Sequence, residues 1–174
     1  MTLIAIDIAV TITIGTALML VVCMIWLIAE FNGMKEEIRT KTDKNNNALQ
    51  LKLQAYERLT LFAERAGIKN MVSRVTYTDQ SAIGMQTDLL EALRTEFDYN
   101  TSQQIYVSNE VWQAVSKLRD QNVYIVNQLA ASLPADASAM DLSRRLIEYS
   151  LTDKAELNVI VLDALQYEAK KLMT

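Results

Sequence analysis

The hydrophobic pattern begins with one long apolar run. Residues 8–29 contain no charged side chain, and about 20 apolar residues are enough for a helix to cross a bilayer. A cleaved signal peptide would have a basic N-terminal region and a shorter apolar core, but no Lys or Arg precedes this run. The pattern therefore predicts a retained transmembrane anchor over residues 1–31.

Basic residues near the apolar run predict its orientation. The N-terminal flank carries only Asp7, whereas Lys35, Arg39, Lys41 and Lys44 follow the run closely. Lys and Arg near the end of a span stay in the cytoplasm. We therefore expect the N-terminus outside the cell and the body of the chain in the cytoplasm.

Small side chains recur every four residues within the anchor. Such strips allow helices to approach closely in lipid, so one interpretation is packing against another membrane helix or a second copy. The other is chance, because Ala and Thr are common in membrane helices. The strip consists of Ala5, Ala9, Thr13 and Ala17.

Beyond the anchor, the pattern changes to that of amphipathic helices. Residues 32–47 mix charges with Asn45, Asn46 and Asn47, and predict a solvated connector, either partly helical or irregular, with a break or an N-cap at the asparagines. From residue 48, apolar side chains recur every three or four residues, which indicates helices with a buried face. The pattern predicts helices over 48–66, 79–99, from Ser108 to Pro134, 138–150 and 152–173. Thr78 is the predicted N-cap of the second of these helices, and Ser108 that of the third. Residues 68–77 fit either a short helix or an extended turn, and residues 105–107 are strand-like.

These stripes predict an all-α fold, in which the transmembrane helix is followed by a cytoplasmic bundle of about five helices over residues 48–174. Leu51, Leu61 and Phe62 widen the stripe of the first helix, so we expect it to contact several neighbours. The other stripes include Met85, Leu89, Leu93 and Phe97, then Val111, Val115, Leu118, Ile125 and Leu129, then Leu157, Ile160, Val161, Ala164, Leu165 and Leu172.

Composition and charge argue against several functions. The net charge is -4, whereas nucleic-acid binding requires a basic face. The chain has no His and one Cys, Cys23, inside the anchor, so the commonest general base and zinc ligand are missing. No phosphate-binding loop or hydrolase motif occurs. We therefore expect no enzyme activity, metal, cofactor or small-molecule substrate.

Two groups of body residues are candidates for function. Glu57 and Glu64 share one helix face and could act as an acid and a base, or simply form a solvated face with Arg58 and Arg65. Aromatic and amide side chains gather around a predicted helix break. They could form a partner surface, or the rings could be buried with their polar ends at water. This second group is Tyr99, Gln103, Gln104, Tyr106 and Trp112.

Three stretches of the body carry a resemblance to a known family. They are residues 53–62 with Glu64 and Arg65, residues 96–100, and residues 103–108 with Trp112. With them the chain resembles the small single-pass membrane proteins of unknown function found in the Bacteroidota. The resemblance implies a bacterial inner-membrane location and no catalytic residues. This chain has Ala66, Gly67 and Ile68 where such proteins often have Pro or Asn.

These features together suggest a non-enzymatic scaffold or accessory subunit of a bacterial inner-membrane assembly. Its expected partners are the lipid bilayer and a membrane protein or a second copy of the chain. One alternative is a regulatory binding module that recruits a soluble protein or peptide, which would require an exposed apolar groove. A carboxylate-based enzyme is a further alternative, and it would require a buried acid in a cleft.

Overall fold

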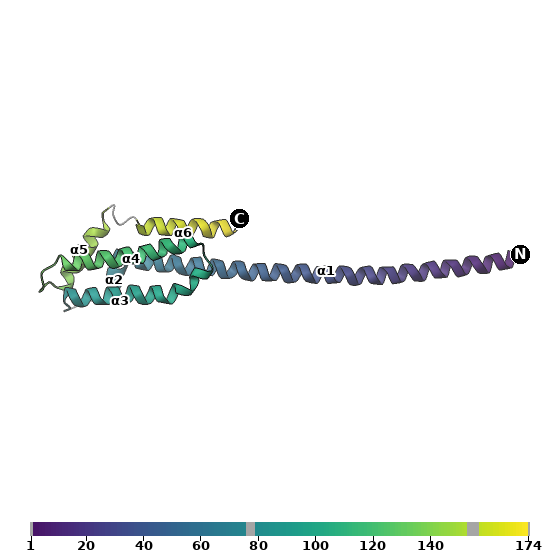
Figure 1. Cartoon of the computed structure of the whole chain (residues 1–174), viewed down its shortest axis with the longest axis horizontal. Coiled ribbons are helices and arrows are strands. Elements are labelled where there is room, and N and C mark those ends of the chain that lie inside the picture. Colours follow the sequence, from purple (N-terminus) through teal and green to yellow (C-terminus); the bar gives the residue numbers. More distant parts are fainter. Residues whose placement is uncertain (1, 76–78, 153–156, 174) are drawn as a thin grey trace. The chain divides into compact units, whose positions relative to one another are not determined.

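The computed structural model describes residues 2–75, 79–152 and 157–173, and describes side chains from residue 14 onward. These residues form an all-α fold, as predicted (Figure 1). The chain divides into two compact units, Met1–Ala48 and Leu49–Thr174. Its elements are α1 (Thr2–Ala66), α2 (Ile68–Arg74), α3 (Ala82–Asn100), the 3-10 helix η1 (Thr101–Ile105), α4 (Asn109–Ala131), α5 (Ala139–Ser150) and α6 (Leu157–Met173).

The connector is helical, so the expected break at Asn45, Asn46 and Asn47 is wrong. Asn lowers helix stability by no more than about 0.7 kcal/mol relative to Ala, whereas only Gly and Pro cost more. Neither Gly nor Pro occurs between residues 34 and 66. An ion pair of 2.8 Å between Lys41 Nζ and Glu37 Oε1, four residues apart, also favours the helix.

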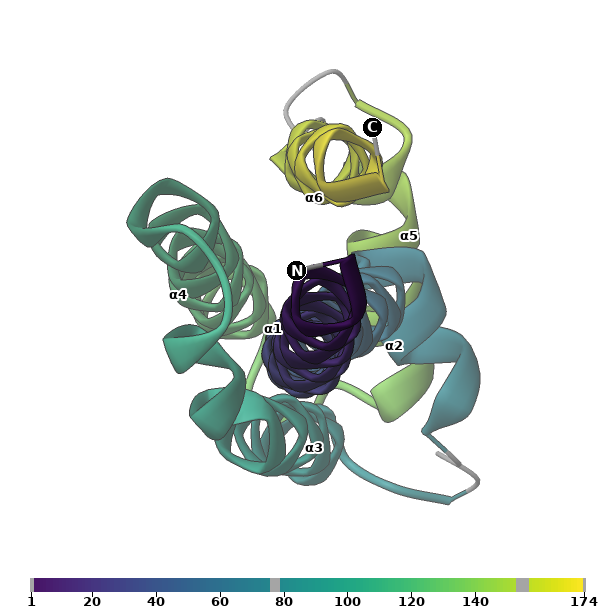
Figure 2. The same cartoon turned by 90° about the vertical axis from the view of Figure 1, so that its right-hand side faces the viewer.

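Residues 49–66 of α1 form the centre of the second unit. Figures 1 and 2 show α3, α4 and α6 alongside this segment. Leu59 and Ala63 are completely buried there. The largest fully buried side chains come from all the longer helices, and they are Phe62, Leu59, Met85, Leu89, Leu118, Leu142, Leu146, Leu165, Val115, Val126 and Val161.

The predicted stripes are confirmed in their central parts. Met85, Leu89, Leu93 and Phe97 of α3 are all buried. Leu51 and Leu61 of α1 are exposed, and so is Ile160 of α6. For these three residues the predicted burial is wrong, because periodicity identifies a helix face but not how far the neighbouring helix covers it.

Serine side chains begin three of the helices. Ser108 accepts a hydrogen bond from the backbone N–H of Val111, as the predicted N-cap of α4. The N-cap of α3 is Ser81, later than the predicted start of that helix, and Thr78 lies outside the described residues. Ser138 caps α5 and donates to Asp141, which lowers the pKa of that carboxyl group.

The two uncertain segments of the body are both helical. Residues 68–74 form α2, whose first residue follows Gly67. Residues 101–105 form η1, so the strand-like interpretation of residues 105–107 is wrong. An extended strand needs a partner to satisfy its backbone groups. Tyr106 N–H instead donates to Gln103 O within the turn, over 3.0 Å.

Candidate functional site

The predicted aromatic group lies where α3, η1 and α4 join. Trp112 is half-buried and stacks on Phe97, with ring centroids 5.3 Å apart. Phe62 of α1 also contacts Phe97, with ring centroids 5.7 Å apart in an edge-to-face arrangement. The guanidinium carbon of Arg119 lies 4.2 Å from the Phe97 ring centroid. This part of the group therefore packs the bundle together.

The remaining predicted residues of this group divide between core and solvent. Gln103 is buried and Tyr106 is half-buried, whereas Gln104 is exposed. Tyr99 is 74% exposed and lies beneath Arg58, whose guanidinium carbon is 4.7 Å from the ring centroid. The surface that a partner could reach here is thus provided by Tyr99 and Gln104.

A polar network joins α1, α6 and the start of α4. The Tyr56 hydroxyl donates to Glu168 Oε2 over 2.6 Å, and the Ser108 hydroxyl donates to Glu168 Oε1 over 2.7 Å. Burial raises the pKa of Tyr56 to about 12, with a further contribution from the hydrogen bond to Glu168. Glu168 is half-buried. Because both of its oxygens are engaged, this carboxylate fixes the position of α6.

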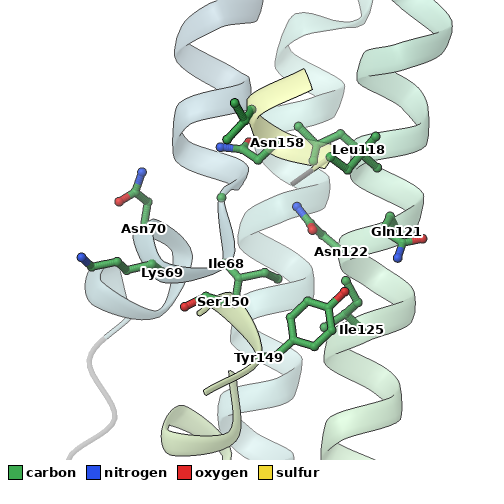
Figure 3. A pocket seen from close by; sticks show the side chains of 13 residues that line it. Ile68, Lys69, Asn70, Leu118, Gln121, Asn122, Ile125, Tyr149, Ser150 and Asn158 are labelled. Carbon is green, nitrogen blue, oxygen red and sulfur yellow. The ribbon is translucent and has the colours of Figure 1, made fainter. Parts of the chain in front are cut away.

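A cavity of about 240 Å³ lies beside the break between α1 and α2. Figure 3 shows Ile68, Lys69 and Asn70 on one side of it, and Leu118, Asn122 and Ile125 of α4 on the other. The buried Asn122 donates from Nδ2 to the backbone oxygen of Ala66, over 2.7 Å. This bond satisfies one of the carbonyl groups that a helix leaves free at its C-terminal end.

Helix α6 approaches closely to the glycine at this break. A Cβ at Gly67 would lie 3.2 Å from Asn158 Nδ2 and 3.3 Å from the backbone oxygen of Glu64. The side-chain oxygen of Asn158 is buried and has no hydrogen-bond partner among the described residues. The cavity thus combines apolar walls with carboxamide groups, a lining suited to water or a small polar molecule.

An open groove of about 380 Å³ runs between α1 and α6. Its walls include the two predicted carboxylates, Glu57 and Glu64, together with Asp163 of α6. All three acids are exposed. Apolar atoms form its floor, mainly from Leu53, Leu162, Ala169 and the ring of Tyr56.

The comparison with protein families shows to which family this chain belongs. A model of a family of unknown function (DUF7935) matches residues 2–172. The chain belongs to this family. No curated protein and no solved structure matches it. The expectation of an uncharacterised family is confirmed, and the description of DUF7935 names no activity.

In this DUF7935 protein, the described part of the anchor is exposed. Ala17 and Cys23 both lie on the exposed surface of α1. The side chains of Ala5, Ala9 and Thr13, which form the rest of the predicted strip, lie outside the described residues. Helix α1 is long and apolar enough to cross a membrane.

Sequence reasoning identified only one wall of the groove in this DUF7935 protein. The spacing of Glu57 and Glu64 indicated a shared face, but nothing near them in sequence indicated Asp163. The cavity was missed altogether. Its one local signal is Gly67, which marks the end of α1.

Proposed function

We propose that this protein is a non-enzymatic, membrane-anchored scaffold or accessory subunit of a bacterial inner-membrane assembly. In this proposal, α1 crosses the membrane once with its N-terminus outside. The helical unit from Leu49 onward lies in the cytoplasm and binds another protein. The resemblance to single-pass proteins of the Bacteroidota supports the bacterial location.

The exposed apolar surface of α1 carries this proposal. The large apolar side chains between Ile14 and Phe31 are each 55–70% exposed, on all sides of the helix. A helix that is apolar all round is stable in a protein core or in a membrane. From Ile14 onward, where the side chains are described, none of the residues in its most apolar part is buried in the protein. Lipid or other membrane helices therefore provide the cover that these side chains need.

The basic residues after the span support the orientation. Lys35, Arg39, Lys41 and Lys44 are all exposed on α1, and the positive-inside rule assigns such a flank to the cytoplasm. Protease added to spheroplasts should leave a C-terminal tag on the protein intact. Protease added after lysis should remove it. Cleavage of the tag in intact spheroplasts would refute the orientation.

The scaffold function is tested by isolating the native protein with its neighbours. The tagged full-length chain is crosslinked in membranes, extracted in mild detergent and analysed by size and mass spectrometry. We expect a defined complex with at least one other membrane protein, or a homo-oligomer of fixed size. A lone monomer, without any crosslinked partner, would refute the function.

A second candidate function is a recruiting module that brings a soluble protein or peptide to the membrane. The groove between α1 and α6 favours it, since this function requires an exposed apolar groove. The two candidates differ in the partner that is crosslinked. A soluble partner attached to the groove would favour recruitment, and an integral membrane partner would favour the accessory subunit.

A further inference from the structure

The groove between α1 and α6 is built from two antiparallel helices in a fixed register. Tyr56 of α1 contacts Glu168 near the end of α6, whereas Gly67, the residue directly after α1, lies beside Asn158 near the start of α6. Residue numbers thus rise along one wall and fall along the other. The two walls run alongside each other for the length of the groove.

The groove-lining residues lie along one face of each helix. Leu53, Glu57, Thr60 and Glu64 follow each other at steps of four, three and four residues along α1. Leu162, Gln166 and Ala169 do the same along α6, at steps of four and three. Alternating steps of four and three residues keep these side chains on one face of each helix, where a further helix can pack. From Leu53 to Glu64 the wall is about 16 Å long, at 1.5 Å per residue, which suits two to three turns of a docked helix.

The polar atoms at the floor of the groove already have partners. The Tyr56 hydroxyl donates to Glu168, and the Thr60 hydroxyl donates to the backbone oxygen of Tyr56 over 2.8 Å. The floor therefore presents mainly apolar atoms to an occupant. An apolar stripe can cover it without leaving a buried polar atom unpaired.

The charges on the rim identify the kind of occupant. Glu57 and Glu64 line one wall and Asp163 the other, and among the described residues no Lys or Arg lines the groove. A second copy that paired through the same face would place acids against acids, since a two-fold interface brings the same surface of both copies together. An acidic rim around an apolar floor instead complements an apolar stripe flanked by cations.

We propose that this groove binds a basic amphipathic helix of a partner protein. The partner carries Lys or Arg seven residues apart, facing Glu57 and Glu64, and a further cation on the other side of its apolar stripe, facing Asp163. This inference rests on the proposed function, for which it names the chemistry of the partner.

The test uses the full chain in nanodiscs of zwitterionic lipid and a labelled 18-residue peptide of Leu and Lys. The peptide forms a helix with Leu on one face and Lys on both flanks. A second peptide has Glu in place of every Lys. Binding is followed by fluorescence anisotropy, with the signal of empty nanodiscs subtracted.

Two variants with the same net charge separate the groove from general acidity. The groove variant carries Glu57→Gln, Glu64→Gln and Asp163→Asn. The matched control carries Glu91→Gln, Asp98→Asn and Asp136→Asn, three exposed acids that do not line the groove. Circular dichroism and thermal unfolding verify that both variants fold like the unmodified chain.

We expect the Lys peptide to bind the unmodified chain, and the Glu peptide not to bind. The groove variant should weaken binding of the Lys peptide at least tenfold, and the control variant by less than twofold. Raising the salt concentration to 0.5 M should also weaken binding of the Lys peptide to the unmodified chain. This is about five times the concentration at which the screening length is 10 Å, so the attraction between the charges is largely screened. Equal loss in both variants would show attraction by net charge alone and overturn the proposal. Absence of binding to the unmodified chain would overturn it as well.

The crosslinked complex separates a failure of this inference from a failure of the proposed function. If the groove variant loses the native partner while the control variant keeps it, the groove is the docking site. If both variants keep the partner, the groove assignment is wrong and the scaffold function stands. If the unmodified chain has no partner in membranes, the scaffold function fails, while the peptide titration still decides what the groove binds.

Discussion

Removing one hydroxyl group from Tyr56 should measurably destabilise the bundle. The substitution Tyr56→Phe keeps the ring, which is only 4% exposed, and deletes the donor that lies 2.6 Å from Glu168 Oε2. The carboxylate then keeps its bond from the Ser108 hydroxyl. The change therefore tests a single hydrogen bond without creating a large cavity.

The expected cost follows from the charge of the acceptor. A hydrogen bond to a charged group contributes about 1.5–3 kcal/mol. Glu168 is half-buried, so water can replace part of the lost bond, and we expect a decrease of about 2 kcal/mol in the free energy of unfolding. For a domain of intermediate size, this corresponds to a Tm lower by about 6–10 °C.

The assay is thermal unfolding of the full-length chain in detergent, followed by far-UV circular dichroism. Tyr167→Phe is the matched control, because that tyrosine is 69% exposed on α6. Its Tm should stay within about 1 °C of the unmodified chain, as surface substitutions usually cost less than 0.5 kcal/mol. The double variant with Glu168→Gln completes a thermodynamic cycle.

Two results would contradict this reasoning. One is a cost of Tyr56→Phe below about 0.5 kcal/mol, within the range of an ordinary surface change. The other is the same cost in the presence and absence of Glu168→Gln, which would show that the hydroxyl group acts independently of the carboxylate. In either case the network would not fix α6.

Three further predictions concern other parts of the chain. The pKa of Tyr56 rises from 10.0 to about 12 in the folded protein, so the stabilising effect of its hydroxyl group is complete below pH 10 and is lost as the pH rises to 12. The Tm difference between the unmodified chain and Tyr56→Phe should therefore narrow between pH 10 and pH 12. A Tm difference that stays constant over this range would contradict the prediction. Asn122→Ala should cost about 1–3 kcal/mol, because the carbonyl of Ala66 loses its buried donor; Gln121→Ala, at an exposed neighbour, is the control in the same unfolding assay. Replacing Ala9 and Thr13 by Leu should reduce oligomer size in mild detergent if the small-residue strip packs helices together; an unchanged size on gel filtration would exclude the strip.

The longest regular stripes were predictable because apolar side chains that recur every three or four residues lie on one face of a helix, and that face is the one buried in the core. Met85, Leu89, Leu93 and Phe97 recur every four residues, and α3 buries them all. Ser108 was predictable as an N-cap for a similarly local reason, since its hydroxyl group accepts from a backbone N–H three residues away. Both features depend on neighbours within one helix.

Exposure at the margins of a stripe depends on other helices instead. Leu61 adjoins Phe62 in sequence, yet it is 50% exposed whereas Phe62 is 1% exposed. The difference arises because Phe97 of α3 lies against the Phe62 ring. No pattern within residues 48–66 specifies the position of that partner. Periodicity therefore predicts the middle of a buried face better than its edges.

The groove is harder to predict from the sequence than any of these features, because its lining depends on the register in which α6 packs alongside α1. Glu57 and Glu64 are seven residues apart, so their shared face was evident, but it indicated a solvated surface. Asp163 joins them in the register in which Glu168, five residues later on α6, accepts hydrogen bonds from Tyr56 and Ser108 and Val161 and Leu165 are buried. A shift of α6 by one turn would move Asp163 by about 5.4 Å, enough to remove it from the rim. A hydrogen bond whose partners are separated by 112 residues thus contributes, together with the buried side chains of α6, to the register that sets which charges a partner helix would meet.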